Sequence, residues 1–144
     1  MEVENFFGNS YPGTNCFKQS DRTDTNITRF NAVANDYMER GIDLNEQLIR
    51  NKPATFFMRV KGDSMTGAGI HDGDVVIVDR AVKALSGKVI IAALNGEMLI
   101  RRFEKNFSRI RLVPETAKLS PIDIDLSGSE FSIWGVVTYV IHSL

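Results

Sequence analysis

The chain has 144 residues, of which 43% are apolar and 24% charged, and its formal net charge is −1. This length and balance are typical of one globular domain. A near-neutral charge argues against direct binding of nucleic acid, so we expect any connection with DNA to run through a protein partner. The single cysteine, Cys16, excludes an internal disulfide and is typical of a reducing compartment. With no apolar run of about 18 residues and no secretory-type N-terminus, we expect a cytoplasmic protein without membrane contact.

Residues 1–30 are predicted to form a flexible N-terminal arm. The segment is rich in Asn, Ser, Thr, Asp, Gly and Pro and has no sustained period of either helix or strand. Such a composition buries too little apolar surface to order the backbone, so we expect an extended segment mostly without regular structure. Residues 31–144 are predicted to form the folded domain. The candidate anchors of the arm are Phe6, Phe7, Phe17 and Phe30.

A short helix is predicted near residues 43–50. Asp43 is a suitable N-cap, and Glu46 lies three residues later, as in a capping box. Pro53 disfavours helical continuation through the residue before it. We expect the helix to pack against the body. Its apolar stripe is Leu44, Leu48 and Ile49.

From residue 54 onward the pattern changes to β, and we expect six or seven strands up to about residue 142. The runs are rich in Val, Ile and Phe and are bounded by turn residues. They are TFFMRVK, DVVIVD, KVIIAAL, EMLIRRF, RIRLVP and FSIWGVVTYVIH. The fold class predicted is therefore mainly β, a curled antiparallel domain. Its core should include Met65, Val75, Ile77, Ile90, Ala92, Leu99, Val113, Trp134 and Val136.

The Asn95-Gly96 pair predicts a tight β-hairpin with a type I′ turn. A two-residue turn places Ile90 opposite Arg101. Because side chains alternate along a strand, Leu99, Arg101 and Phe103 should share one face. Arg101 is therefore expected to point inward between two large apolar residues.

Ser64 lies in VKGDSMTGAGIHDGDVVIVDR, between two strand-like runs and among turn residues. A serine hydroxyl becomes a nucleophile only when a base accepts its proton. His71 and His142 are the candidates for a triad, but both are more simply interpreted as surface or strand-end residues. The other solution is a buried, neutral lysine on a neighbouring strand. The inward position that suits such a lysine is occupied by Arg101.

Five blocks occur in an order that resembles the UmuD/LexA family of self-cleaving serine peptidase-like proteins, over about residues 30–144. The blocks are KGDSM, GIHDGDVVIVDR, KVIIAALNGEMLIRR, RLVPETAKLSPIDI and FSIWGVVTYVI. The resemblance is stronger to the UmuD branch, because the first 50 residues lack the pair of periodic helices that a LexA-like repressor carries before this domain. It implies a LexA/signal-peptidase-like antiparallel β domain that forms dimers.

The resemblance also implies a Ser-Lys dyad, with Ser64 as the nucleophile and Arg101 at the lysine position. Arginine is not deprotonated in proteins, so Arg101 cannot serve as the base. The family cleaves its arm between a small residue and glycine, whereas Thr28 and Arg29 occupy the equivalent positions here. We expect Ser64 and Arg101 to lie close together without self-cleavage. Other lysines, none at the matching position, are Lys61, Lys88 and Lys105.

The resemblance predicts an SOS-response accessory protein that regulates error-prone translesion DNA synthesis. The implied partners are a Y-family DNA polymerase catalytic subunit, the RecA filament, the sliding clamp and a second copy of the chain. We expect the dimer to use the apolar C-terminal run FSIWGVVTYVIHSL, and we expect neither a cofactor nor a metal ion. Two alternatives are an active self-cleaving peptidase that uses Ser64 with another base, and a LexA-like repressor remnant.

Overall fold

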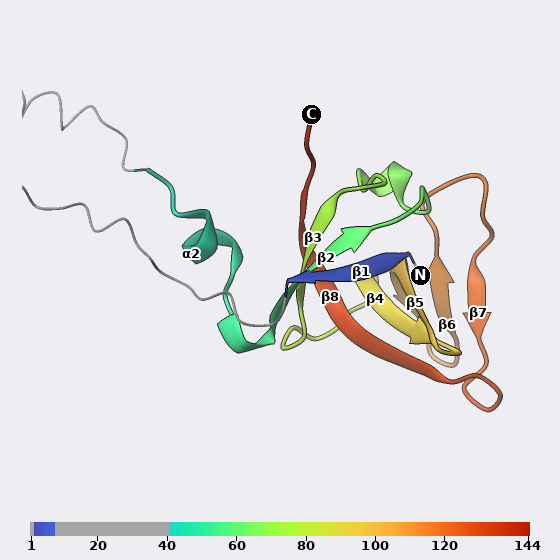
Figure 1. Ribbon diagram of the computed structural model, residues 1–144. Coiled ribbons are helices and arrows are strands. Elements are labelled where there is room, and N and C mark those ends of the chain that lie inside the picture. The colour runs from blue at the N-terminus through green and yellow to red at the C-terminus, as the bar shows by residue number, and fades with distance from the viewer. Residues whose placement is uncertain (1, 8–40) are drawn as a thin grey trace, which may run out of the picture.

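The computed structural model describes residues 2–7 and 41–144. Their strands form one curled sheet in the order β1-β2-β3-β8-β4-β5-β6-β7, with antiparallel pairing throughout (Figure 1). The mainly β, antiparallel fold predicted from the sequence is confirmed. The strands are β1 Val3–Phe7, β2 Thr55–Val60, β3 Val75–Asp79, β4 Val89–Leu94, β5 Glu97–Lys105, β6 Ile110–Val113, β7 Ile122–Ile124 and β8 Phe131–Ile141. The helical elements are α2 Leu44–Leu48, η1 Lys52–Ala54 and η2 Thr66–Ala68.

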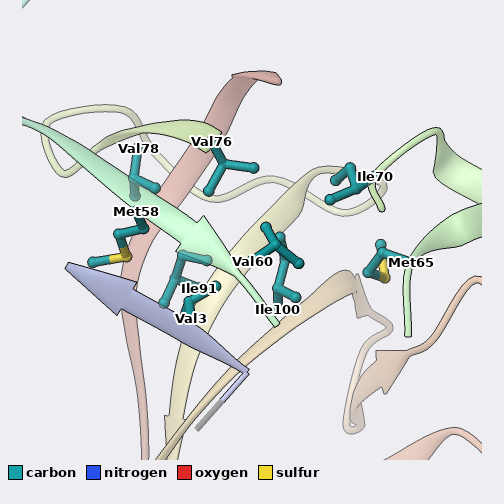
Figure 2. Close-up of a cluster of buried hydrophobic side chains, with 9 residues drawn as sticks. All are labelled: Val3, Met58, Val60, Met65, Ile70, Val76, Val78, Ile91 and Ile100. Atoms are coloured by element: carbon teal, nitrogen blue, oxygen red, sulfur yellow. The ribbon is translucent and has the colours of Figure 1, made fainter. Parts of the chain in front are cut away.

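Two clusters of buried apolar side chains form the core. The first joins β1 to β5 and the segment after β2, and Figure 2 shows its members converging from these elements. The second joins β4 to β8 and consists of Ile90, Ala92, Phe103, Leu112, Ile124 and Val136. Most of the predicted core is buried, but Val75, Val113 and Trp134 are only half-buried. Trp134 packs against the first cluster. Phe56 contacts its ring at 4.7 Å between centroids, and the Arg80 guanidinium lies 4.7 Å from its ring centroid.

Strand β1 corrects part of the prediction for the N-terminal arm. Instead of lacking regular structure, Val3–Phe7 pairs with β2, and Val3 lies opposite Val60. Val3 is buried among the side chains of the first core cluster. The composition of a five-residue segment could not predict this strand, because its hydrogen-bond partners are supplied by the otherwise unpaired edge of β2. The remaining predictions for residues 1–30, including the boundary at residue 30, lie outside the described residues.

Helix α2 begins where the sequence predicts, and the Asp43 side chain accepts a hydrogen bond from the Asn45 backbone N–H at 2.9 Å. Its predicted packing role is borne out only at its end, where Leu48 is half-buried. The helix buries none of its own residues, Leu44 is 63% exposed, and only Ile49, just after the helix, is buried. Figure 1 shows the helix to one side of the sheet. With only five residues, the helix is too short to present an apolar stripe. No helix in the described ranges has the length and apolar character that a membrane crossing requires.

Strand β8, which contains most of the run expected to form the dimer, is an interior strand of the sheet. It lies between β3 and β4 in the sheet. Its first half pairs with β4, from Phe131 to Val136, and its second half pairs with β3, from Val136 to Ile141. Each half of β8 therefore has one strand partner among the described residues. The apolar side chains exposed toward its end include Tyr139, Val140 and Ile141.

Candidate functional site

Ser64 lies in a tight turn between β2 and η2, and two other segments hold this turn. The Gly62 backbone N–H donates to Asp72 Oδ1 at 2.7 Å, and Gly62 has a φ of +90° that favours glycine. The Glu115 backbone N–H donates to the Ser64 carbonyl oxygen at 2.9 Å, and the Gly67 N–H donates to the Glu115 carbonyl at 2.7 Å. Ser64 is buried. The hydroxyl is therefore held in a fixed place beside the sheet.

Arg101 reaches the same region from β5. The pairing of Ile90 with Arg101 is the one that the hairpin turn predicted, and Asn95 and Gly96 both have positive φ. Arg101 is buried on one face of β5 together with Leu99 and Phe103. The predicted inward direction of Arg101 is thus correct.

The neighbouring Arg102 ties β5 to the segment that holds the Ser64 turn. Its Nε donates to the Glu115 carboxylate, and its Nη1 donates to the Gly87 carbonyl oxygen. Glu115 therefore binds the Ser64 turn through its backbone and β5 through its side chain. This connection was not predicted from the sequence.

Glu2 lies between Ser64 and Arg101 and contacts both. Arg101 donates to the Glu2 carboxylate through two nitrogens, Nη1 to Oε2 at 2.5 Å and Nη2 to Oε1 at 3.1 Å. Glu2 Oε2 also accepts from Ser64 Oγ at 3.4 Å and from the Ile100 backbone N–H at 3.3 Å. Ser64 and Arg101 therefore share one carboxylate. Glu2 is the main site residue that sequence reasoning missed.

The backbone of Glu2 is bound as well as its side chain. The Lys61 N–H donates to the Glu2 carbonyl oxygen at 2.5 Å, and the Glu2 N–H donates to the Met98 carbonyl oxygen at 3.3 Å. Glu2 thus bridges the end of β2 and the start of β5 just before β1 begins. The ion pair is an extension of the strand pairing that orders the first residues.

The Arg101 guanidinium is held in place but not fully satisfied. Its Nη1 also donates to the Ile100 carbonyl oxygen at 2.7 Å. Its Nε is buried without an acceptor, which is the one such side-chain atom found in the described part of the chain. Arginine stays protonated, so this group can bind a carboxylate strongly but cannot accept the Ser64 proton.

The other candidate bases do not replace Arg101 in the described structure. Lys61, Lys88 and Lys105 are exposed, whereas a lysine acts as a neutral base when it is desolvated. His71 and His142 lie beside Asp74, and neither hydrogen bonds to Ser64 among residues 2–7 and 41–144. The cleavage-site equivalents Thr28 and Arg29 lie outside the described residues. Their role stays a prediction.

An open cleft of about 440 Å³ adjoins the ion pair. Its wall combines apolar side chains with charged ones, including Glu2 and Arg101. The cleft is lined by Glu2, Leu94, Asn95, Glu97, Leu99, Arg101 and Ile122.

A second, exposed ion pair lies next to Ser64. Lys118 Nζ is 2.6 Å from Asp63 Oδ2, and both side chains are more than half exposed. The hydrogen bond and charge of Lys118 lower the pKa of Asp63 below its ordinary value, and Asp63 raises the pKa of Lys118 in return. The Ser64 turn thus has a buried pair on one side and a solvated pair on the other.

Comparison with known proteins matches the segment that contains Ser64 and Arg101, whereas Glu2 lies before it. The model of the Peptidase S24-like family matches residues 27–138. Protein SamA of Salmonella typhimurium strain LT2 is 42% identical over 113 residues, which is 78% of this chain and 77% of that protein. Protein ImpA of Escherichia coli is 41% identical over 113 residues, 78% of this chain and 76% of that protein. Protein MucA of Escherichia coli is 36% identical over 115 residues, 80% of this chain and 76% of that protein.

Proposed function

Because the chain belongs to the Peptidase S24-like family, we propose that it is a UmuD-like accessory protein of the SOS response that does not cleave itself. One observation carries the second half of this proposal. Arg101, which the family resemblance puts at the position of the base, is buried and paired with Glu2, and the Glu2 carboxylate lies 3.4 Å from Ser64 Oγ.

The loss of cleavage follows from proton chemistry. A positioned general base contributes about 10²–10⁴-fold to the rate, and a permanently charged guanidinium cannot fill that role. The Glu2 carboxylate already accepts hydrogen bonds from Arg101, Ser64 and Ile100. The arm adds a second obstacle, since Arg29 stands in place of the glycine at the equivalent bond. Base and cleavage site are both altered, which is consistent with a chain that persists in its intact form.

The proposed role is regulatory. In the resembled family the intact form restrains damage-tolerant synthesis and the cleaved form supports it. An intact form that cannot mature would therefore act as a lasting restraint. The proposed partners are a Y-family polymerase catalytic subunit, the RecA filament and the sliding clamp, and their support is family membership.

We propose that the chain forms a homodimer through the end of β8. Tyr139, Val140 and Ile141 are exposed apolar residues in a half-strand with one described partner strand. Exposed apolar groups next to unpaired backbone favour pairing with another chain. Sedimentation at micromolar concentration should give a dimer, and a monomer at that concentration would remove this part of the proposal.

The main test measures the mass of the purified chain after incubation with RecA filaments or at alkaline pH. The unmodified protein should keep its full mass. The variant Thr28→Ala, Arg29→Gly, Arg101→Lys should be cut slowly between residues 28 and 29. Adding Ser64→Ala to this variant should abolish the cut. Cleavage of the unmodified protein near residue 28 that depends on Ser64 would contradict the proposal and favour an active peptidase with another base.

Glu2 provides a sharper version of the same test. A carboxylate beside the introduced lysine would hold that lysine in its charged form. Adding Glu2→Gln to the triple variant should therefore increase the cleavage rate, whereas adding Glu97→Gln should not. Equal rates for the two additions would show that Glu2 does not occupy the site in solution.

A further inference from the structure

The chain has two histidines, and both lie beside the same buried carboxylate. One ligand atom each from His71, Asp74 and His142 lies within 4.8 Å of the others. This is the one such group of His, Cys, Asp or Glu side chains in the described part of the chain. The cluster is separate from the Ser64–Arg101 site and takes no part in the function proposed above.

Strand register brings the three residues together. Val75 of β3 lies opposite Ile141 of β8, so the residues just beyond this pair, Asp74 and His142, are also neighbours. His71 is placed by the turn before β3. Its backbone N–H donates to Asp74 Oδ2 at 2.8 Å, and its carbonyl oxygen accepts from the Asp74 N–H at 3.1 Å. Gly73, with a φ of +85°, allows this turn. The carboxylate is therefore fixed by the backbone before any side chain adds to it.

The side chains converge on the carboxylate from two sides. His142 Nδ1 is 2.5 Å from Asp74 Oδ1, and His71 Nδ1 is 3.7 Å from Asp74 Oδ2. The two imidazole rings lie 5.1 Å apart between centroids. The Asp74 side chain is 3% exposed, whereas His71 is 50% and His142 47% exposed. The cluster thus has a rigid buried anion and two half-exposed rings that can turn toward a common centre.

Electrostatics keep the carboxylate in its charged form. Burial alone would raise the pKa of Asp74. The hydrogen bond from the His71 backbone and the contacts with both histidines outweigh that effect and hold this pKa below its ordinary value. A charged carboxylate oxygen and two imidazole nitrogens are ligand types that zinc and other first-row transition ions favour, while magnesium and calcium favour sites made of oxygen alone.

We propose that His71, Asp74 and His142 form a binding site for a divalent transition-metal ion such as zinc. Metal–ligand bonds of about 2.0–2.1 Å require ligand atoms about 3.3 Å apart around a tetrahedral ion. The present separations of up to 4.8 Å exceed this. Binding would therefore require the half-exposed rings to rotate toward the ion while Asp74 stays in place. With three protein ligands, at least one coordination position faces solvent.

A bound ion would link the turn before β3 to the end of β8. His142 and Asp74 are 68 residues apart in sequence, so the three ligands meet only when both strands are folded. Metal binding should therefore stabilise the folded chain in proportion to the free metal concentration. The ion would fix the residue that follows β8, next to the surface proposed for dimerisation.

The test uses the full-length, tag-free chain after dialysis against a chelator. Titration with zinc chloride should show one saturable site per chain and a midpoint of thermal unfolding that rises with zinc. Cobalt(II) should give the visible absorption of a low-symmetry site, and magnesium should give no shift. Absence of saturable zinc binding at millimolar zinc would overturn the proposal.

Matched variants identify the ligands. His142→Gln and His71→Gln keep a hydrogen-bonding side chain of similar size but remove the imidazole. Each should weaken zinc binding at least about tenfold, the loss expected when metal coordination is impaired. Cys16→Ser should bind zinc as the unmodified chain does, because the proposed ligands are His71, Asp74 and His142. Circular dichroism checks that the variants are folded. Zinc binding that survives both histidine substitutions, or that is lost in Cys16→Ser, would overturn the assignment.

Discussion

Two polar clusters hold the two ends of the chain to the same sheet, and they do so with opposite charges buried. At the N-terminal end the buried member is a cation: Arg101 has a side chain 6% exposed, and its partner Glu2 is 24% exposed. At the C-terminal end the buried member is an anion: Asp74 is 3% exposed, and its partner His142 is 47% exposed. Both pairs join residues far apart in sequence, separated by 99 and 68 positions.

The difference between the clusters is one of reversibility. A guanidinium keeps its proton, so the Arg101 charge is permanent and depends on Glu2 for compensation. Imidazole can change its protonation and can bind metal ions, and a carboxylate fixed by backbone can serve several partners. The Glu2–Arg101 pair is thus suited to a permanent link between the first residues of the chain and β5. The His71–Asp74–His142 cluster is suited to the reversible binding of a metal ion.

The largest effect on stability is expected at Glu2. Glu2→Gln leaves the buried Arg101 charge without its counter-ion, a change that costs about 3–5 kcal/mol for fully buried pairs. Because Glu2 is about a quarter exposed, we expect a loss of about 3 kcal/mol in the free energy of unfolding. Urea unfolding measures it. Glu97→Gln is the matched control, since Glu97 lines the same cleft and has no ion-pair partner among the described residues. Equal midpoints for the two variants would show that the pair does not form in solution.

A smaller loss is expected at the C-terminal cluster. His142→Ala removes one hydrogen bond from Asp74, but the His71 backbone N–H still binds this carboxylate. Water can also reach the vacated position, because the histidine ring is half exposed. We expect a loss of about 1 kcal/mol, measured in chelator at neutral pH. Ser143→Ala is the control. A loss as large as that of Glu2→Gln would mean that the two clusters contribute equally to the free energy of unfolding, which would contradict this expectation.

The sequence predicted what local pairing determines and missed what long-range pairing determines. The two-residue turn at Asn95 and Gly96 sets the register of β4 and β5, so the inward direction of Arg101 could be derived from the residues alone. Glu2 could not be placed, because its partners come from β2 and β5 and the composition around it resembles an unstructured arm. His142 was interpreted as a strand-end residue, which it is. Its proximity to Asp74 depends on the order of β3 and β8, which no local pattern encodes.

The Ser64 hydroxyl is expected to contribute little to stability. Its contact with Glu2 Oε2 is 3.4 Å, longer than the usual 2.5–3.0 Å of an O–H···O hydrogen bond. Ser64→Ala should therefore change the free energy of unfolding by about 0.5 kcal/mol or less. Thr55→Val is the comparison, because the buried Thr55 hydroxyl donates to the Asn51 carbonyl at 2.8 Å and should cost about 1 kcal/mol. If Ser64→Ala lowers the free energy of unfolding as much as Thr55→Val does, the Ser64 hydroxyl helps to stabilise the Glu2–Arg101 ion pair.

The smallest effect belongs to the exposed pair of Asp63 and Lys118, which shows how an ion pair behaves without burial. Lys118 lowers the pKa of Asp63, so this pair contributes stability above the unfolded carboxyl pKa and loses it as the pH falls through the lower folded value. An NMR titration of the Asp63 carboxyl should give a midpoint below 3.8. Lys118→Ala should move that midpoint upward. Salt at about 1 M should do the same, because the Debye length is then about 3 Å. A midpoint that Lys118→Ala leaves unchanged would mean that the Asp63 backbone causes the shift.

The buried Glu2–Arg101 pair should respond to salt differently. The midpoint of urea unfolding of the Glu2→Gln variant should stay below that of the unmodified protein in the same salt, because the Glu2–Arg101 pair is mostly shielded from ions.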